Sequence, residues 1–67
     1  MNLKLMSKAE YDRVSPYTQG YAVYWEGDQE GSELKGLTNP YAAGTKAHDD
    51  WNRGQQAATQ DAQDSEE

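Results

Sequence analysis

The chain has 67 residues, and its 6 Lys or Arg against 12 Asp or Glu give a formal net charge of −6 at pH 7. This charge disfavours direct nucleic-acid binding, which depends on Lys and Arg that neutralise phosphates, and the absence of cysteine excludes disulfides and thiolate zinc sites. No apolar run is long enough to span a membrane or to act as a signal peptide, so we expect a soluble cytoplasmic protein.

The first predicted element is a short N-terminal helix. An S-x-x-E motif begins at Ser7 and has the form of a capping box, in which Ser7 and Glu10 each accept a hydrogen bond from the other's backbone amide. Tyr11 and Val14 are three residues apart and therefore fall on one side of a helix. The sequence predicts a helix over 8–14.

A second and longer helix is predicted to follow at once. Ser15 is a suitable N-cap, and Pro16 occupies the first helical position, where proline is favoured. Beyond Pro16, aromatic residues and glycines recur at spacings of three and four, which is the period of a helix and not of a strand. We predict a helix over 16–28 that supplies a thin, aromatic core, because the chain has few Leu and Val and no Ile but has five Tyr and two Trp. The scaffold and core residues assigned to it are Tyr17, Gly20, Tyr21, Tyr24 and Gly27.

The connector, residues 26–38, is rich in glycine and acid. Its carboxylates suggest a calcium loop, but such a loop also needs a glycine at its sixth position and a Glu at its twelfth. Those residues are not at the required offsets, so we interpret the segment as a solvated acidic linker.

A turn and a third helix complete the predicted elements. The Asn-Pro-Tyr turn that begins at Asn39 favours an extended backbone before its proline. Thr45 is placed to cap a helix over 45–62, on which small residues let a neighbouring helix come close. The scaffold and core residues assigned to this half are Pro40, Tyr41, Trp51, Gly54 and Ala58.

These elements predict an all-α fold. The two main helices are expected to pack as an antiparallel hairpin, with the short N-terminal helix beside them. Residues 1–62 then form a single small domain, and 63–67 form a frayed acidic tail that has nothing to bury. The acidic connector and the acidic tail are expected at opposite ends of this hairpin.

The sequence predicts no catalytic, cofactor-binding or metal-binding residue. His48 is followed by Asp49 and Asp50, but side chains of adjacent helical residues point about 100° apart and do not converge. A glycine-rich phosphate loop is also missing. We therefore do not expect an enzyme.

The aromatic residues suggest a second kind of site. Rings on a surface can stack on nucleic-acid bases, but such platforms need basic neighbours, and the neighbours here are acidic. We assign most rings to the core and leave Trp25 or Tyr41 for the surface, where Trp and Tyr often anchor a protein partner. The candidate partner-binding residues are Trp25, Glu26, Asp28, Glu30 and Glu33.

Three short motifs lie between residues 20 and 58: Gly-Tyr with a second glycine six residues after the tyrosine, Pro-Tyr, and W-x-x-G with a later alanine. In these motifs the chain resembles the ribosome modulation factor family, whose members carry G-Y-x-x-x-x-x-G, C-P-Y and W-x-x-G-W-x-x-A. The resemblance implies two helices joined by a linker that dock on the small ribosomal subunit and promote inactive ribosome dimers. The shared scaffold would be Gly20, Tyr21, Gly27, Pro40, Tyr41, Trp51, Gly54 and Ala58.

The chain also departs from that family. Asn39 stands in place of the Cys before proline, Gln55 stands where a second Trp is common, and the ribosome-binding members are strongly basic whereas this chain is acidic. We interpret it as a small, non-enzymatic accessory factor of a phage or mobile element that binds and modulates a host protein. A basic, nucleic-acid-binding surface of the host protein is the expected target, as for an inhibitor or an anti-defence protein. The alternative is a ribosome-associating modulator of translation or hibernation.

Overall fold

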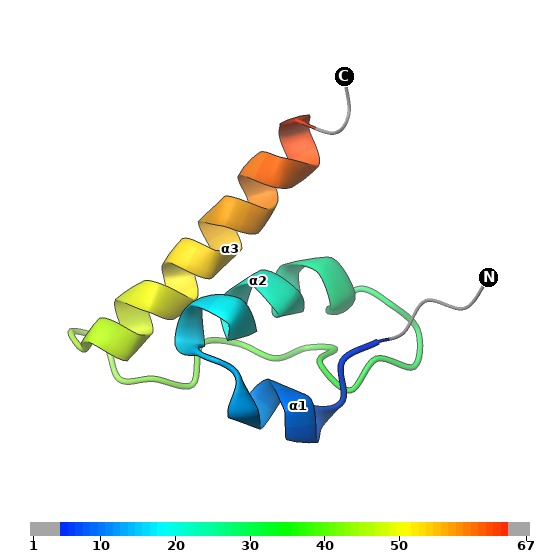
Figure 1. Ribbon diagram of the computed structural model, residues 1–67, viewed down its shortest axis with the longest axis horizontal. Coiled ribbons are helices and arrows are strands. Elements are labelled where there is room, and N and C mark those ends of the chain that lie inside the picture. Colours follow the sequence, from blue (N-terminus) through cyan, green and yellow to red (C-terminus); the bar gives the residue numbers. More distant parts are fainter. Residues whose placement is uncertain (1–4, 65–67) are drawn as a thin grey trace.

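A computed structural model describes residues 5–64, which contain three helices and no strand (Figure 1). The helices are α1 (Lys8–Arg13), α2 (Pro16–Glu26) and α3 (Lys46–Asp64). This confirms an all-α chain. None of the three is long and apolar enough to cross a membrane.

Each helix begins where the sequence predicts, and a side chain caps its first turn. Ser7 and Glu10 form the complete capping box of α1, and the Ser15 hydroxyl accepts from the amide of Thr18 at the start of α2. At α3 the Thr45 hydroxyl accepts from the amide of His48 at 3.2 Å. Each bond satisfies an amide that has no partner within its helix.

The helix ends differ by one or two residues from the prediction. Val14 is extended and lies outside α1, while α2 stops at Glu26 because Gly27 forms its C-cap. Helix α3 continues through Gln63 to Asp64, two residues beyond its predicted end. No glycine or proline interrupts this stretch, and its Ala and Gln residues favour the helix. Positions 65–67 of the predicted tail, and 1–4 of the predicted domain, lie outside the described residues.

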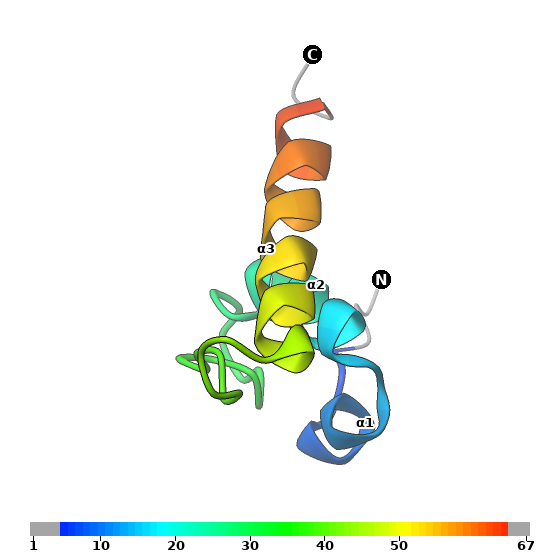
Figure 2. The same cartoon turned by 90° about the vertical axis from the view of Figure 1, so that its left-hand side faces the viewer.

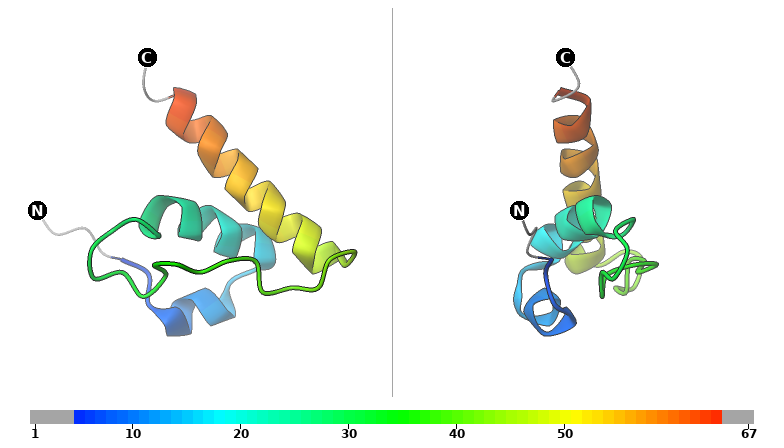
Figure 3. Two further views of the ribbon diagram at one scale, coloured as in Figure 1. Left: turned by 180° about the vertical axis from the view of Figure 1, so that it is seen from behind. Right: turned by 90° about the vertical axis from the view of Figure 1, so that its right-hand side faces the viewer.

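The two long helices pack together, but not as an antiparallel hairpin. Opposite views show that α2 and α3 run in the same general direction and diverge towards their C-terminal ends (Figures 1 and 3). The distal half of α3 extends beyond the other elements (Figure 2). A long connector makes this possible, because it returns along the molecule from the end of α2 to the start of α3.

Two glycines bring α2 and α3 into backbone contact. A Cβ atom at Gly54 would lie 2.7 Å from the backbone nitrogen of Tyr21 and even closer to the carbonyl oxygen of Tyr17. A Cβ atom at Gly20 would similarly meet the backbone of Trp51. The helices therefore cross at a point where neither can carry a side chain.

The core lies between α2, α3, α1 and the connector. Trp51 is 5% exposed, and its indole N–H donates to the hydroxyl of Tyr11 at 3.0 Å, which ties α1 to α3. Gln19 is buried with both ends of its amide bonded: it donates to the Tyr11 carbonyl and accepts from the Tyr41 hydroxyl. The buried hydrophobic residues are Tyr11, Ala22, Val23, Leu34, Trp51 and Ala58.

The predicted aromatic core needs correction. Tyr17 is 45% exposed and Tyr24 is 36% exposed, so both rings lie on the surface. The close backbone contact of α2 with α3 leaves no room for large rings between the helices and displaces them to the flanks. Among the other assigned residues, Gly20, Trp51, Gly54 and Ala58 are buried, Tyr21, Gly27 and Tyr41 are partly buried, and Pro40 is exposed.

Candidate functional site

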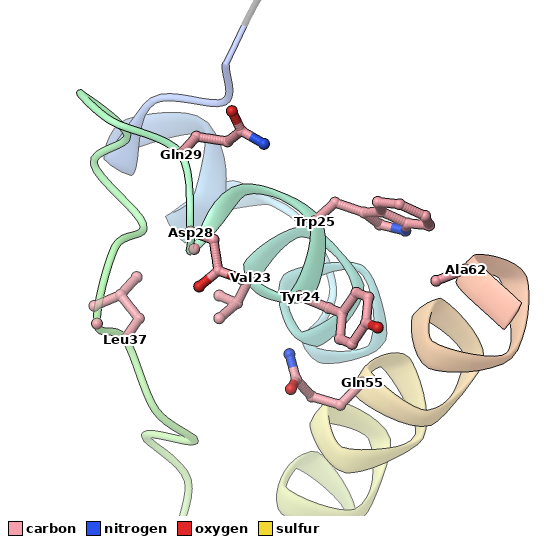
Figure 4. Close-up of a pocket in the computed structure, with 10 residues that line it drawn as sticks. Val23, Tyr24, Trp25, Asp28, Gln29, Leu37, Gln55 and Ala62 are labelled. Atoms are coloured by element: carbon pink, nitrogen blue, oxygen red, sulfur yellow. The ribbon is translucent and has the colours of Figure 1, made fainter. Parts of the chain in front are cut away.

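An open pocket of about 530 Å³ lies around the C-terminal end of α2 (Figure 4). On one side α2 faces the connector at Leu37, and on the other it faces α3 at Gln55 and Ala62. The pocket exists because α2 and α3 diverge beyond their crossing point. No ring fills the gap from the α3 side, where the lining side chains are an amide and a methyl group.

Aromatic side chains of α2 line this pocket. Tyr24 and Trp25 are 36% and 40% exposed and meet edge to face, with ring centroids 5.6 Å apart and planes at 82°. The ring of Tyr21 lies 6.4 Å from that of Trp25. Figure 4 shows the Trp25 ring on the side that faces Ala62. Rings held at fixed angles but left exposed are typical of protein-binding anchors.

A hydrogen bond from Tyr21 joins α2 to the distal half of α3. The hydroxyl of Tyr21 donates to Oδ2 of Asp61 at 2.5 Å. This bond is the main cause that raises the pKa of Tyr21 above its usual value. Because it lies beyond the glycine crossing, it limits how far the two helices separate at the pocket.

The raised pKa gives stability a dependence on alkaline pH. The folded chain holds the Tyr21 proton more tightly than the unfolded chain, so this contribution is complete below the unfolded pKa, near 10, and is lost as the pH rises through the folded value. We expect Tyr21→Phe to remove this part of the alkaline loss of stability. Urea denaturation from about pH 9 to pH 11 tests it, with Tyr24→Phe as the control. A Tyr21→Phe profile parallel to that of the parent would contradict the assignment.

The predicted partner-binding acids divide into two groups. Glu26 accepts from the amide of Met6 at 2.6 Å, and Glu33 accepts from the amide of Lys8 at 2.8 Å, so both hold the N-terminal segment in place. Glu30 forms an exposed ion pair with Lys35 at 3.4 Å. Of the four predicted acids, only Asp28 lines the pocket with Trp25.

Negative charge gathers on the side of the molecule where α2 and α3 end. Because the two helices run in the same direction, the negative ends of both helix dipoles lie on that side (Figure 1). No Lys or Arg occurs between Arg13 and Lys35 or after Arg53. The acids of the α2 end and of the α3 end therefore lie on one side, and not at opposite ends of a hairpin as predicted.

Sequence reasoning missed Tyr24 and Asp61 as parts of this surface. The spacing of Tyr17, Tyr21, Tyr24 and Trp25 places them on one helical face, but the spacing does not say what covers that face. Asp61 is forty residues from its partner Tyr21, and no local pattern indicates such a pair.

Asn39, the residue before the proline of the predicted turn, contacts α3. The side chain of Asn39 donates to the carbonyl of His48 at 3.0 Å and to Asn52 at 3.1 Å, which fixes the turn against α3. Within residues 5–64, no group of three or more His, Asp or Glu side chains is placed to hold a metal ion.

Comparison with known proteins yields no relative: no family model, no curated protein and no solved structure matches the chain.

Proposed function

We propose that the chain is a non-enzymatic interaction protein of the cytoplasm that binds a host protein and modulates it. The observation that carries this proposal is the pair of exposed rings, Tyr24 and Trp25, in an open pocket on the acidic side of the molecule. The partner presents a basic surface, such as one that otherwise binds nucleic acid. An accessory factor of a phage or mobile element, built on a scaffold like that of the ribosome modulation factors, fits this description.

Rings and charges have different parts in this binding. A desolvated aromatic anchor contributes mainly to slow dissociation, while charges at the rim accelerate encounter with a partner of opposite charge and make it depend on salt. Asp28 is exposed at the edge of the pocket, on the side of α2 that faces the connector, so it is a rim charge (Figure 4). Glu26 and Glu33 are not assigned as rim charges, because their side chains hold the N-terminal segment and substituting them would release it.

One observation favours the alternative, a ribosome-associating modulator. Gly20, Trp51 and Gly54, which belong to the resemblance with ribosome modulation factors, meet at a single helix crossing. Sedimentation of a lysate through a sucrose gradient separates the two proposals. Migration with small subunits or with ribosome dimers supports the alternative, and migration apart from ribosomes supports the first proposal.

The first proposal predicts a large effect of Trp25→Ala on binding. Loss of an anchoring tryptophan typically costs about 2 kcal/mol or more, which is roughly a thirtyfold loss of affinity. Capture on the tagged chain, followed by mass spectrometry, identifies the partner, and titration of the purified pair measures the affinity. Tyr17→Ala is the matched control, because Tyr17 is an exposed ring of the same helix that does not line the pocket.

A stability control and a contradicting outcome complete this test. Thermal melts of both variants should stay close to that of the parent, since both rings are exposed. Equal losses of affinity in Trp25→Ala and Tyr17→Ala would contradict a binding site at the pocket.

A further inference from the structure

We propose that the pocket at the C-terminal end of α2 receives an arginine side chain of the partner, with its guanidinium against Tyr24 and Trp25. This inference rests on the proposed function, because it names the group by which the partner is recognised.

The arrangement of the rings fits a flat cation. Tyr24 and Trp25 are nearly perpendicular, at 82° with centroids 5.6 Å apart, and so they form a corner with two aromatic surfaces. A guanidinium within about 6 Å of a ring centroid is attracted by the electrons of the ring. Across the pocket Ala62 contributes only a methyl group, so the corner faces open space and not another ring (Figure 4).

The charges around the corner favour a cation and oppose an anion. Asp61 is held on the facing helix by its bond to Tyr21, while Asp28 lines the pocket on the other side of α2, towards Leu37 (Figure 4). The last turns of α2 and α3 contain no basic residue, so their helix dipoles are not compensated there.

Arginine fits this setting better than lysine. Its guanidinium is planar, stacks on aromatic faces and is weakly hydrated, whereas the ammonium of lysine is compact and strongly hydrated. The structure thus predicts discrimination between two residues of equal charge.

Two tryptophans with opposite surroundings make the inference testable by NMR. The indole N–H of Trp51 is buried and donates to Tyr11, while Trp25 is 40% exposed in the pocket. The intact, ¹⁵N-labelled chain is titrated with a short peptide of alternating glycine and arginine, and separately with the same peptide carrying lysine. We expect the arginine peptide to move the Trp25 indole signal and to saturate at a several-fold lower concentration than the lysine peptide. The Trp51 signal should stay in place and serves as the internal reference.

Variants locate the site. Trp25→Ala should weaken binding of the arginine peptide, and Tyr17→Ala should leave it unchanged. Equal responses to arginine and lysine would overturn the inference. A Trp25 signal that neither peptide moves would also overturn it, as would a response that Trp25→Ala leaves intact.

Failure here is distinct from failure of the proposed function. A partner that is captured through Trp25 but binds without preference for arginine overturns this inference and leaves the proposed function standing. A partner whose affinity does not depend on Trp25 overturns the proposed function itself.

Discussion

Replacing Trp51 by alanine is expected to unfold most of the chain at room temperature. The side chain is 5% exposed, and truncation of a buried tryptophan typically costs about 3–5 kcal/mol. The change also removes the donor to the Tyr11 hydroxyl, which would lose its partner in the core. A domain of this size has only a few kcal/mol of total stability, so the loss is comparable to the whole.

The matched control is the same substitution at the other tryptophan. Trp25 is 40% exposed, so Trp25→Ala should melt within a few degrees of the parent when followed by far-ultraviolet circular dichroism. A cooperative melt of Trp51→Ala at the temperature of the parent would show that Trp51 does not hold the core together.

A milder pair of variants separates packing from hydrogen bonding. Trp51→Phe keeps a ring but loses the indole N–H, and Tyr11→Phe keeps its ring but loses the acceptor. Each substitution should lower the free energy of unfolding by about 1–3 kcal/mol. Trp51→Phe leaves a smaller ring and an unpaired Tyr11 hydroxyl, and Tyr11→Phe leaves the indole N–H of Trp51 unpaired. The double variant should cost less than the sum of the two, since the bond can be lost only once. Strict additivity would contradict a direct bond between the two side chains.

The parts of the fold that could be predicted are those that depend on near neighbours in the sequence. The caps at Ser7, Ser15 and Thr45 each involve an amide three residues away, so the pattern that specifies them is visible in a short window. The helical period of α2 is similarly local, and it predicts which residues share a face.

The direction of the connector could not be predicted in this way. Leu34 is an isolated apolar residue in an acidic segment, yet it is 0% exposed and packs in the core with Val23 and Trp51. Its burial draws the connector back along the molecule, which places α3 alongside α2 in the same direction. Glu26 and Glu33 add two bonds to the N-terminal segment, at separations of 20 and 25 residues. Contacts of this range leave no periodic signal in the sequence.

Only part of the candidate site could be predicted from the sequence, for a related reason. A stripe of rings indicates a face with large contact area, and the sequence pattern does not tell a core face from a binding face. The backbone contact at Gly20 and Gly54 decides between them here. It places the backbones of the helices where rings would otherwise interdigitate, and so Tyr24 and Trp25 remain exposed beside α3.

Replacing Gly54 by alanine is therefore expected to destabilise the chain, although alanine is the better helix former. In an isolated helix the change would gain about 1 kcal/mol. In this structure the new Cβ would lie 2.7 Å from the backbone nitrogen of Tyr21 and closer to the carbonyl of Tyr17, and backbone atoms inside a helix cannot turn away as a side chain can. We expect a net loss of about 3 kcal/mol, the upper part of the usual range for overpacking, measured by urea denaturation.

The sign of the effect distinguishes the crossing from propensity alone. Gln60→Ala on the exposed face of α3 is the control, and it should leave stability nearly unchanged or raise it slightly. Separation of the helices should also break the bond from Tyr21 to Asp61, so Gly54→Ala should lose the alkaline dependence that this bond confers. If instead Gly54→Ala gained stability, as propensity predicts, the helices would not be in backbone contact, and the exposure of Tyr24 and Trp25 would need another cause.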